Sequence, residues 1–226
     1  MRARSKRYRK DATGVGEGAL PLGAAVAKLK GWATTKFDQT VECVAVLGID
    51  AKQAEQTVRG AISLPHGIGK SLRVVAFCEG EDVEKARQAG AIEAGAEELI
   101  KKIEGGWMDF DVAVAQPRLM GKVGKLGRVL GPQGKMPSPK SGTVTANVAE
   151  AVKEYAAGKV EFRNDSGGNV HGVVGKLSFP AEKLAENTAA FLEMIRRLKP
   201  SVAKGTYIKK VFLSGAMSPS VQVEVG

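Results

Sequence analysis

Apolar and polar residues alternate along segments near both ends of the chain. Residues 37–47 alternate in this way, with an apolar residue at every second position from Val41 onward, which predicts a strand with one buried face. The apolar positions of this strand are Val41, Cys43, Ala45 and Leu47. Further strands are predicted at residues 58–64, 159–163, 170–179, 206–214 and 221–225. A short helix is expected after Pro21 and a longer one after Pro180, where apolar residues recur at helical spacing.

The middle of the chain has a different pattern. Residues 72–77 and 110–115 are continuous apolar runs, which are typical of strands buried on both faces. Residues 81–88 and 97–103 have the spacing of amphipathic helices. Because strands and helices alternate here, we expect a parallel sheet covered by helices.

These patterns predict an α/β and α+β protein of two domains. Neither end of the chain has enough length to bury a comfortable core alone, so the two ends are expected to fold together. The first domain would be a discontinuous α+β domain with an antiparallel sheet, formed by residues 1–67 and 159–226. The second, residues 68–158, would be an inserted, Rossmann-like parallel α/β domain. Two connections between the domains would permit a hinge motion.

Charge favours a polyanionic partner. The 226 residues include 34 Lys and Arg against 24 Asp and Glu, a net charge of +10 with a pI near 9.6. Residues 2–10 contain no acid and are interpreted as a mobile basic arm. No acid lies between Asp111 and Glu150, where basic residues are interleaved with Gly and Pro. Such a segment suits either close approach to phosphates or a structural loop, and the sequence leaves both open.

Several classes of site are disfavoured by the residues present. Cys43 and Cys78 lie in separate apolar runs, which indicates two buried free thiols in a reducing compartment, with the cytoplasm as the default. The two His residues do not complete a zinc set, and the segment before Ser71 lacks the first glycine of a phosphate-binding loop. Neither a signal peptide nor a membrane span is indicated. We therefore expect no enzyme activity, no cofactor and no metal.

Two side chains are candidate contacts for single-stranded or irregular RNA, which proteins read by stacking and by contacts to base edges. Phe37 stands at a strand start between Lys36 and Asp38, where it is either a stacking platform or part of the core. Met217 interrupts the strand alternation in a serine-rich turn, which favours exposure.

At these residues the sequence resembles the ribosomal L-one family. The first block of resemblance consists of residues 36–42 (KFDQTVE), 47–50 (LGID) and 58–67 (VRGAISLPHG). The second consists of residues 106–111 (GWMDFD), 126–134 (LGRVLGPQG) and 136–144 (MPSPKSGTV). It continues through residues 162–165 (FRND), His171, residues 175–176 and residues 203–206 (AKGT). Several unrelated blocks in order, over essentially the whole chain, make the resemblance specific.

The resemblance implies the same two domains and a structural role in the large ribosomal subunit. The expected partners are large-subunit ribosomal RNA at the mobile stalk, the protein's own messenger RNA, whose translation it would repress, and deacylated transfer RNA leaving the exit site. The protein is expected to be a monomer when free and part of the cytoplasmic ribosome in cells, with no membrane partner. Carried over by position, the RNA-binding residues would be Lys36, Phe37, Thr40, Glu42, Asp165, Ser166, Gly168, His171, Ser214, Met217 and Ser218.

The chain departs from the family pattern in two places. The last turn usually reads Thr-Met-Gly, and here it reads Ala216-Met217-Ser218, with one hydroxyl lost and a Cβ gained. Gln133 and Ser138 replace the usual Arg and Asn, which weakens the case for phosphate contact in that segment. Two rival functions are an enzyme that binds a nucleotide on the inserted domain and a protein-interaction module that uses the basic arm. A nucleotide-binding assay and ribonuclease sensitivity would discriminate them.

Overall fold

The computed structural model describes residues 4–16 and 18–225, and its chain divides into two compact units. One unit joins the two ends of the chain, Met1–Gly69 and Val160–Gly226, and is called the terminal unit below. The other, Lys70–Lys159, is called the inserted unit. The mixed α/β and α+β fold class predicted from the pattern is confirmed, because one unit contains an antiparallel sheet and the other a parallel sheet.

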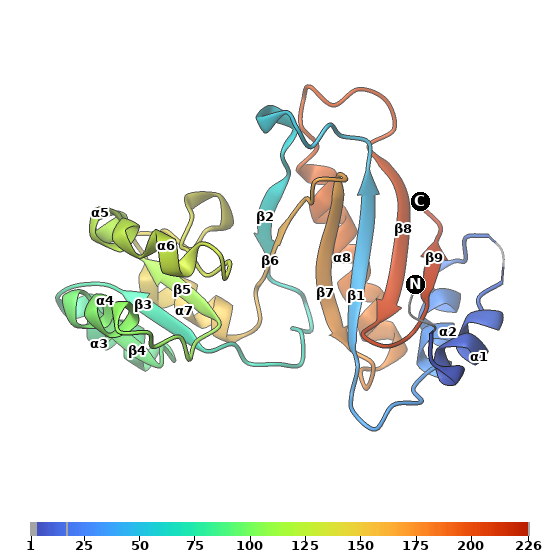
Figure 1. The fold of residues 1–226 in the computed structure, drawn as a ribbon, viewed down its shortest axis with the longest axis horizontal. Coiled ribbons are helices and arrows are strands. Elements are labelled where there is room, and N and C mark those ends of the chain that lie inside the picture. The colour runs from blue at the N-terminus through green and yellow to red at the C-terminus, as the bar shows by residue number, and fades with distance from the viewer. Residues whose placement is uncertain (1–3, 17, 226) are drawn as a thin grey trace. The chain divides into compact units, whose positions relative to one another are not determined.

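The main sheet of the terminal unit has four strands in the order β7-β1-β8-β9 (Figure 1). They are β1 (Thr40–Leu47), β7 (Asn169–Lys176), β8 (Ile208–Gly215) and β9 (Ser220–Val223). All neighbouring strands are antiparallel. The alternation predicted for the first strand is correct, since burial alternates along β1 and Cys43 and Ala45 are fully buried.

Two helices, α2 (Leu22–Gly31) and α8 (Ala181–Arg197), contribute the apolar side chains that pack beneath this sheet. Phe191 of α8 approaches β7 so closely that a Cβ at Gly172 would lie 2.3 Å from its ring. The buried residues of α8 include Leu184, Thr188, Phe191 and Ile195, which are the stripe predicted from helical spacing. The helices therefore bury one face of the sheet, and the side chains of the opposite face are exposed or half-buried.

Three further elements complete the terminal unit. A two-stranded antiparallel sheet pairs β2 (Arg59–Ile62) with β6 (Val160–Arg163), and a short turn of 3-10 helix, η1 (Ala54–Gln56), precedes β2. Residues Lys6–Thr13 form helix α1, with Ser5 as its N-cap. The expectation of a mobile arm is therefore wrong for these residues, while the start of that arm, Arg2 and Ala3, lies outside the described residues.

The inserted unit is built on a parallel sheet in the order β4-β3-β5. These strands are β3 (Val74–Phe77), β4 (Glu93–Gly95) and β5 (Val112–Ala115). Helices α3 (Glu81–Gln88) and α7 (Val148–Ala156) pack on one face, around Tyr155. Helix α4 (Glu97–Glu104) and a series of short helical turns pack on the other, around Phe110.

The Gly-rich segment of the inserted unit is not an open loop. It forms η2 (Pro117–Leu119), α5 (Met120–Val123), η3 (Gly124–Leu126), α6 (Gly127–Leu130) and, later, η4 (Pro139–Ser141). Leu119, Val123, Leu126 and Leu130 are buried at helical spacing and belong to the core. Of the two interpretations left open for this segment, its buried leucines support the structural one. Among the described residues, no helix combines the length and the apolarity needed to cross a membrane.

Candidate nucleic-acid interface

The open face of the four-stranded sheet brings several of the predicted RNA-binding residues together. In the register of the strands, Glu42 of β1 lies opposite Ser214 of β8, and Val44 lies between His171 of β7 and Phe212 of β8. Glu42 and His171 are exposed, and Val44, Phe212 and Ser214 are half-buried. Acceptors, a ring and hydroxyl groups thus share the face opposite to the one that α2 and α8 cover. This composition suits irregular RNA.

Phe37 lies in the loop that leads into β1, and its side chain is 52% exposed. The loop is fastened on both sides of this residue. Thr35 Oγ1 donates to the carbonyl of Phe37 over 2.8 Å, and Asp38 accepts from the backbone N–H and the hydroxyl of Ser178 over 3.0 and 2.8 Å. Of the two alternatives for Phe37, the structure excludes burial in the core. A large exposed ring on a loop held by several hydrogen bonds is a stacking platform in its geometry.

Thr40 opens β1 and accepts a hydrogen bond from Lys176 Nζ over 2.8 Å. This contact places an ammonium group beside the strand start, next to the exposed Lys36 and Phe37. A cation that can reorient between a hydroxyl and a phosphate is useful at a nucleic-acid surface, because phosphate contacts dominate affinity. Lys176 lay in one of the resembling blocks, but neither pattern nor charge singled it out from the other lysines.

The turn that carries Met217 is held from inside by Gln39. This glutamine is fully buried, and its Oε1 accepts from the backbone N–H of Met217 over 2.9 Å. Its Nε2 donates to the carbonyl of Trp32 over 3.4 Å. Met217 itself is 53% exposed, as its place in the sequence predicted. Gln39 therefore connects the turn after β8 to the loop before β1, so that Phe37 and Met217 stay at the same end of the sheet.

Ser218 is buried, and its hydroxyl faces the protein. Its Oγ accepts from the backbone N–H of Gly215 over 2.8 Å and lies 3.2 Å from the carbonyl of Pro219. The hydroxyl gained where the family usually has glycine therefore closes the turn internally. Gly215 is required by this arrangement, because a Cβ there would lie 2.9 Å from both Gln39 Oε1 and Ser218 Oγ.

Asp165, Ser166 and Gly168 form the turn before β7, at the other end of the sheet. Asp165 Oδ1 accepts from the backbone N–H groups of Gly167 and Asn169, each over 2.8 Å, and Oδ2 accepts from Asn169 Nδ2 over 3.0 Å. The hydrogen bonds from Asn169, then those from Gly167, lower the pKa of Asp165 to about 2. Gly168 has φ +78° and is packed against Ile49 and Leu47, so a side chain is excluded there.

The structure therefore separates the predicted site residues into two groups. Lys36, Phe37, Thr40, Glu42, Ser214, Met217 and Ser218 lie at the end where β1 begins. Asp165, Ser166 and Gly168 lie near the end of β1, since Asn169 is the register partner of Val46. His171 lies between the two groups, with its Nε2 3.5 Å from Asp165 Oδ2. Five residues of strand from Val41 to Val46 span roughly 17 Å.

Three residues that shape this surface were missed by sequence analysis, namely Gln39, Lys176 and Arg7. Arg7 of α1 donates from Nη2 to the carbonyl of Met217 over 2.9 Å and from Nη1 to Thr34 Oγ1 over 3.3 Å. Gln39 shares the alternation of Val41 and Cys43, which places it on the buried face, but its polar side chain was not recognised as part of the site. For Arg7 the available signal was the basic arm itself, which was recognised as a charge excess but not as a helix that packs.

Two of the six basic residues between Asp111 and Glu150 are engaged with the fold of the inserted unit. Lys122 lies 2.9 Å from Glu97 and 3.6 Å from Glu79, and the hydrogen bond between Lys122 and Glu97 raises the pKa of the lysine. Lys135 donates to the carbonyl of Met108 over 3.0 Å. Within residues 4–16 and 18–225 no group of three His, Cys, Asp or Glu side chains could hold a metal ion.

Comparison with known proteins shows the family to which the chain belongs. The profile of the Ribosomal protein L1p/L10e family matches residues 29–219, which include strands β1, β7 and β8 of the four-stranded sheet. This chain belongs to that family. A protein of Beutenbergia cavernae named large ribosomal subunit protein uL1 is 53% identical over 99% of this chain and 94% of its own length. Proteins with the same name from Cutibacterium acnes and a Nocardioides strain are each 52% identical over 98% of this chain. They cover 96% and 92% of those relatives.

Membership in the L1p/L10e family confirms the resemblance stated from the sequence motifs. The relatives are bacterial and are named as ribosomal proteins rather than as enzymes. The family match extends across the inserted unit, so both units are family features. It begins after α1, which places Arg7 and the rest of that helix outside the matched residues.

Proposed function

We propose that this chain is a structural constituent of the large ribosomal subunit that binds large-subunit ribosomal RNA through the open face of its four-stranded sheet. The observation that carries the proposal is the grouping of two exposed, soft or aromatic side chains, Phe37 and Met217, at one end of that face. Between them lie acceptors, Glu42 and Ser214, that take donors from 2′-hydroxyl and base amino groups. Glu42 and Asp165 do not bind phosphate, so basic residues around the face supply that attraction.

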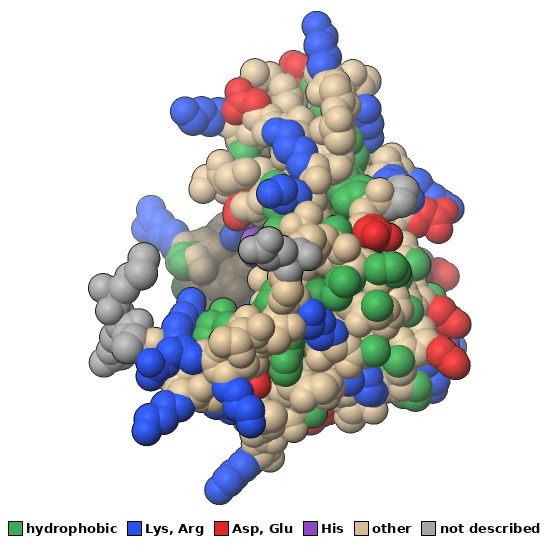
Figure 2. All heavy atoms as spheres, turned by 90° about the vertical axis from the view of Figure 1, so that its right-hand side faces the viewer, with side chains coloured by type: hydrophobic (Ala, Val, Ile, Leu, Met, Phe, Trp, Pro, Cys, Tyr) green, Lys and Arg blue, Asp and Glu red, His purple; other side chains and the backbone are tan. Residues whose placement is uncertain are grey.

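The charge of the terminal unit supports this assignment. It contains 20 Lys and Arg against 12 Asp and Glu, a net charge of +8. Seen from the side of α1 and α2, Lys and Arg side chains gather along one edge of the face (Figure 2). Neutralising roughly four to six phosphates would give a log–log dependence of affinity on salt with a slope of about −3 to −5.

The test is an equilibrium titration with a large-subunit ribosomal RNA fragment and an unrelated RNA of equal length, at several salt concentrations. Phe37→Ala is expected to weaken binding of the ribosomal fragment by about 1–3 kcal/mol, because a stacking platform is lost. Its thermal melt should stay near that of the original protein, since the ring is already 52% exposed.

The matched control is Ile92→Ala, which removes an apolar side chain that is 50% exposed on the inserted unit. This change should leave both binding and melting unaltered. Equal affinity of the original protein for the two RNAs, or a salt-independent affinity, contradicts the proposal. Equal effects of Phe37→Ala and Ile92→Ala would contradict the assignment of the platform.

Two further activities belong to the same proposal, namely assisting the exit of deacylated transfer RNA from the ribosome and repressing translation of the protein's own messenger RNA in the cytoplasm. What supports them is family membership together with a surface suited to irregular RNA rather than to one sequence. A translation reporter that carries the protein's own messenger leader tests repression, with Phe37→Ala as the variant that should relieve it. Transfer RNA release would be followed in ribosomes reconstituted with and without the protein.

A further inference from the structure

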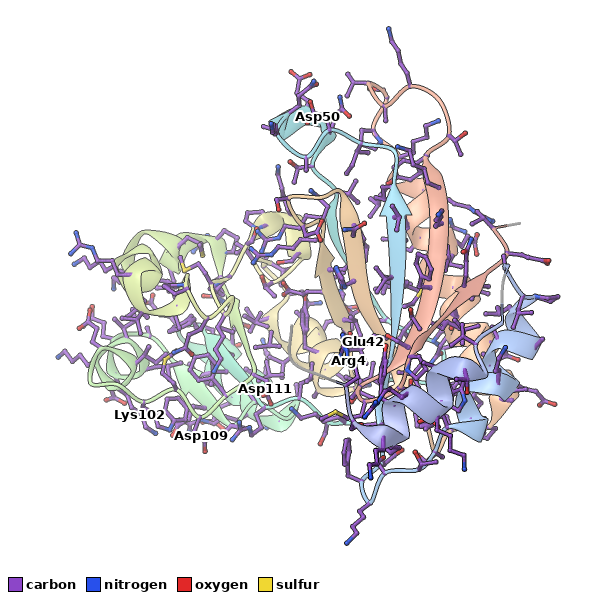
Figure 3. All side chains as sticks on the ribbon, turned by 45° about the vertical axis from the view of Figure 1, so that its right-hand side comes forward. Arg4, Glu42, Asp50, Lys102, Asp109 and Asp111 are labelled. Atoms are coloured by element: carbon purple, nitrogen blue, oxygen red, sulfur yellow. The ribbon has the colours of Figure 1, made fainter. Side chains whose placement is uncertain are left out.

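A cavity of about 1000 Å³ lies in the terminal unit between helix α1 and the open face of the sheet. Its floor is polar and comes from Glu42, Ser214 and Ser220. Arg4 and Tyr8 of the arm line the opposite wall, and the Met217 turn closes one end. Figure 3 shows Arg4 beside Glu42, although 38 residues separate them in the sequence. The volume is at the upper end of the range for small-ligand pockets, so one nucleotide fits with room for its sugar and phosphate.

The wall formed by α1 is fixed to the same turn that presents Met217. Arg7 donates to the carbonyl of Met217, and the Oγ of Ser5 caps the helix by accepting from the N–H of Tyr8 over 3.2 Å. Arg7 also lies 3.9 Å from the buried carboxylate of Asp11, one helical turn further on. These contacts hold Tyr8 at a fixed distance from the sheet, so the cavity is a feature of the folded unit.

The lining determines which ligand suits the cavity. The Arg4 guanidinium lies 4.8 Å from the centre of the Tyr8 ring, which places a cation and an aromatic face side by side. Glu42 on the floor repels a carboxylate-rich peptide and accepts hydrogen bonds from amino or hydroxyl groups. An unpaired nucleotide has all the complementary parts: a flat base for Tyr8, a phosphate for Arg4, and exocyclic amino or 2′-hydroxyl donors for Glu42 and the serines.

We propose that this cavity takes one unpaired nucleotide of the bound RNA, with α1 as the second wall of the binding site. The inference rests on the proposed function, since it assumes that RNA reaches the open face of the sheet. It assigns a role to residues that lie outside the segment matched by the family. Arg4 and Tyr8 of the arm then contact one nucleotide directly, in addition to the positive charge that the arm supplies.

The experiment uses the full chain and the segment of large-subunit ribosomal RNA that it protects from ribonuclease. Tyr8→Ala is expected to lower affinity at least fivefold, because one base loses its stacking partner, and Tyr8→Phe should restore most of it. Arg4→Gln should lower affinity and reduce the steepness of the salt dependence by about one phosphate contact. Arg9→Gln is the matched control. Arg9 lies on α1 with Tyr8, carries the same charge as Arg4 and does not line the cavity.

Ultraviolet crosslinking of Tyr8 then identifies the nucleotide. A crosslink to an unpaired base supports the inference, and a crosslink to a base within a duplex overturns it. Tyr8→Ala and Arg4→Gln variants that bind like Arg9→Gln also overturn it. Circular dichroism and thermal melts accompany each variant. If Tyr8→Ala and Tyr8→Phe lose the same RNA affinity and both melt at a lower temperature, Tyr8 has a structural role only. If the original protein fails to distinguish ribosomal from unrelated RNA, it is the proposed function that fails.

Discussion

The two units of this protein use charged residues in opposite ways. The inserted unit contains 14 Lys and Arg against 12 Asp and Glu, a net charge of +2, whereas the terminal unit has a net charge of +8. In the inserted unit the charges meet within the fold: Arg73 pairs with Asp109 and Asp111, and Lys122 with Glu79 and Glu97. Most of these pairs are exposed and contribute little to stability, so their main effect is to neutralise the surface.

In the terminal unit, basic residues near the open sheet are directed to other partners. Arg7 and Lys176 donate to a carbonyl and a hydroxyl at the sheet end, and Lys36 is exposed. Three cations therefore lie at the end of the face on which Phe37 and Met217 are displayed. The net charge of +10 for the whole chain therefore does not show which unit attracts a polyanion.

The largest effect is expected from separating the units. Residues 1–69 joined to 160–226 by a short Gly-Ser linker should fold and keep most of the affinity for the ribosomal RNA fragment, because Phe37, Glu42 and Met217 all belong to this unit. Residues 70–159 alone should bind that fragment no better than an unrelated RNA. Fluorescence anisotropy on both proteins measures the difference. A folded terminal unit that loses specific binding while the inserted unit retains it would reverse the assignment.

A smaller effect is expected at the buried connection between the two loops. Gln39→Leu leaves the Met217 N–H without its partner, at a cost of about 1–3 kcal/mol in the free energy of unfolding. The Trp32 carbonyl loses one hydrogen bond but still accepts from the backbone N–H of Thr34 over 2.8 Å. Because the Met217 turn also loosens, affinity for RNA should fall even at temperatures where the protein stays folded.

Denaturant melts and binding titrations at low temperature measure the two effects. Gln88→Leu makes the same exchange at an exposed position of α3 and should change neither quantity. If the Gln39 variant is as stable as the Gln88 variant, the buried hydrogen bonds have been overvalued. If it is unstable but binds RNA normally when folded, Gln39 supports the core and not the site.

The smallest effect concerns acid sensitivity of the turn before β7. The pKa of Asp165 is lowered from its ordinary 3.8 to about 2, because the ionised carboxylate accepts hydrogen bonds from Asn169 and Gly167. Its stabilisation is therefore complete above about pH 4 and is lost as the pH falls toward 2. Carboxyl chemical shifts in a pH titration should give a midpoint well below 3.8 for this residue. Asp165→Asn should remove the corresponding titration step from the amide chemical shifts of Gly167 and Asn169. A midpoint near 4 in the original protein would contradict the assigned hydrogen bonds.

The periodicity of apolar residues predicted those strands and helices whose buried face is evident from their own residues. The alternation in β1 and the stripe on α8 are of this kind. Met217 was recognised because it interrupts a strand pattern, and Phe37 because it is an aromatic residue at a strand start between two charged residues. Gln39 was not recognised, because its partners Trp32 and Met217 are brought to it only by the packed sheet. Helix α7 and the short strand β4 escaped prediction for a related reason: their surroundings are set by β3 and α3.

Contacts between distant residues also explain why residues 2–10 were wrongly predicted to be mobile where they form α1. Arg and Lys at six of the nine positions of residues 2–10 leave no apolar stripe, so the sequence offers no reason for a helix to pack. The helix is attached by polar contacts instead, through Arg7 to Met217 and Thr34. Contacts between polar groups far apart in the chain leave little trace in residue order, and the second wall of the cavity was therefore not predicted.

The strand order β7-β1-β8-β9 has a consequence for synthesis on the ribosome. β1 ends at Leu47, yet its two neighbours begin at Asn169 and Ile208 (Figure 1). A growing chain has its first main strand unpaired until most of the polypeptide has emerged, while residues 70–159 can already fold as a unit. A chain that stops before β8 lacks Ser214 and Met217 altogether and leaves one side of β1 open. The open sheet face is thus assembled last, and only a finished protein presents it.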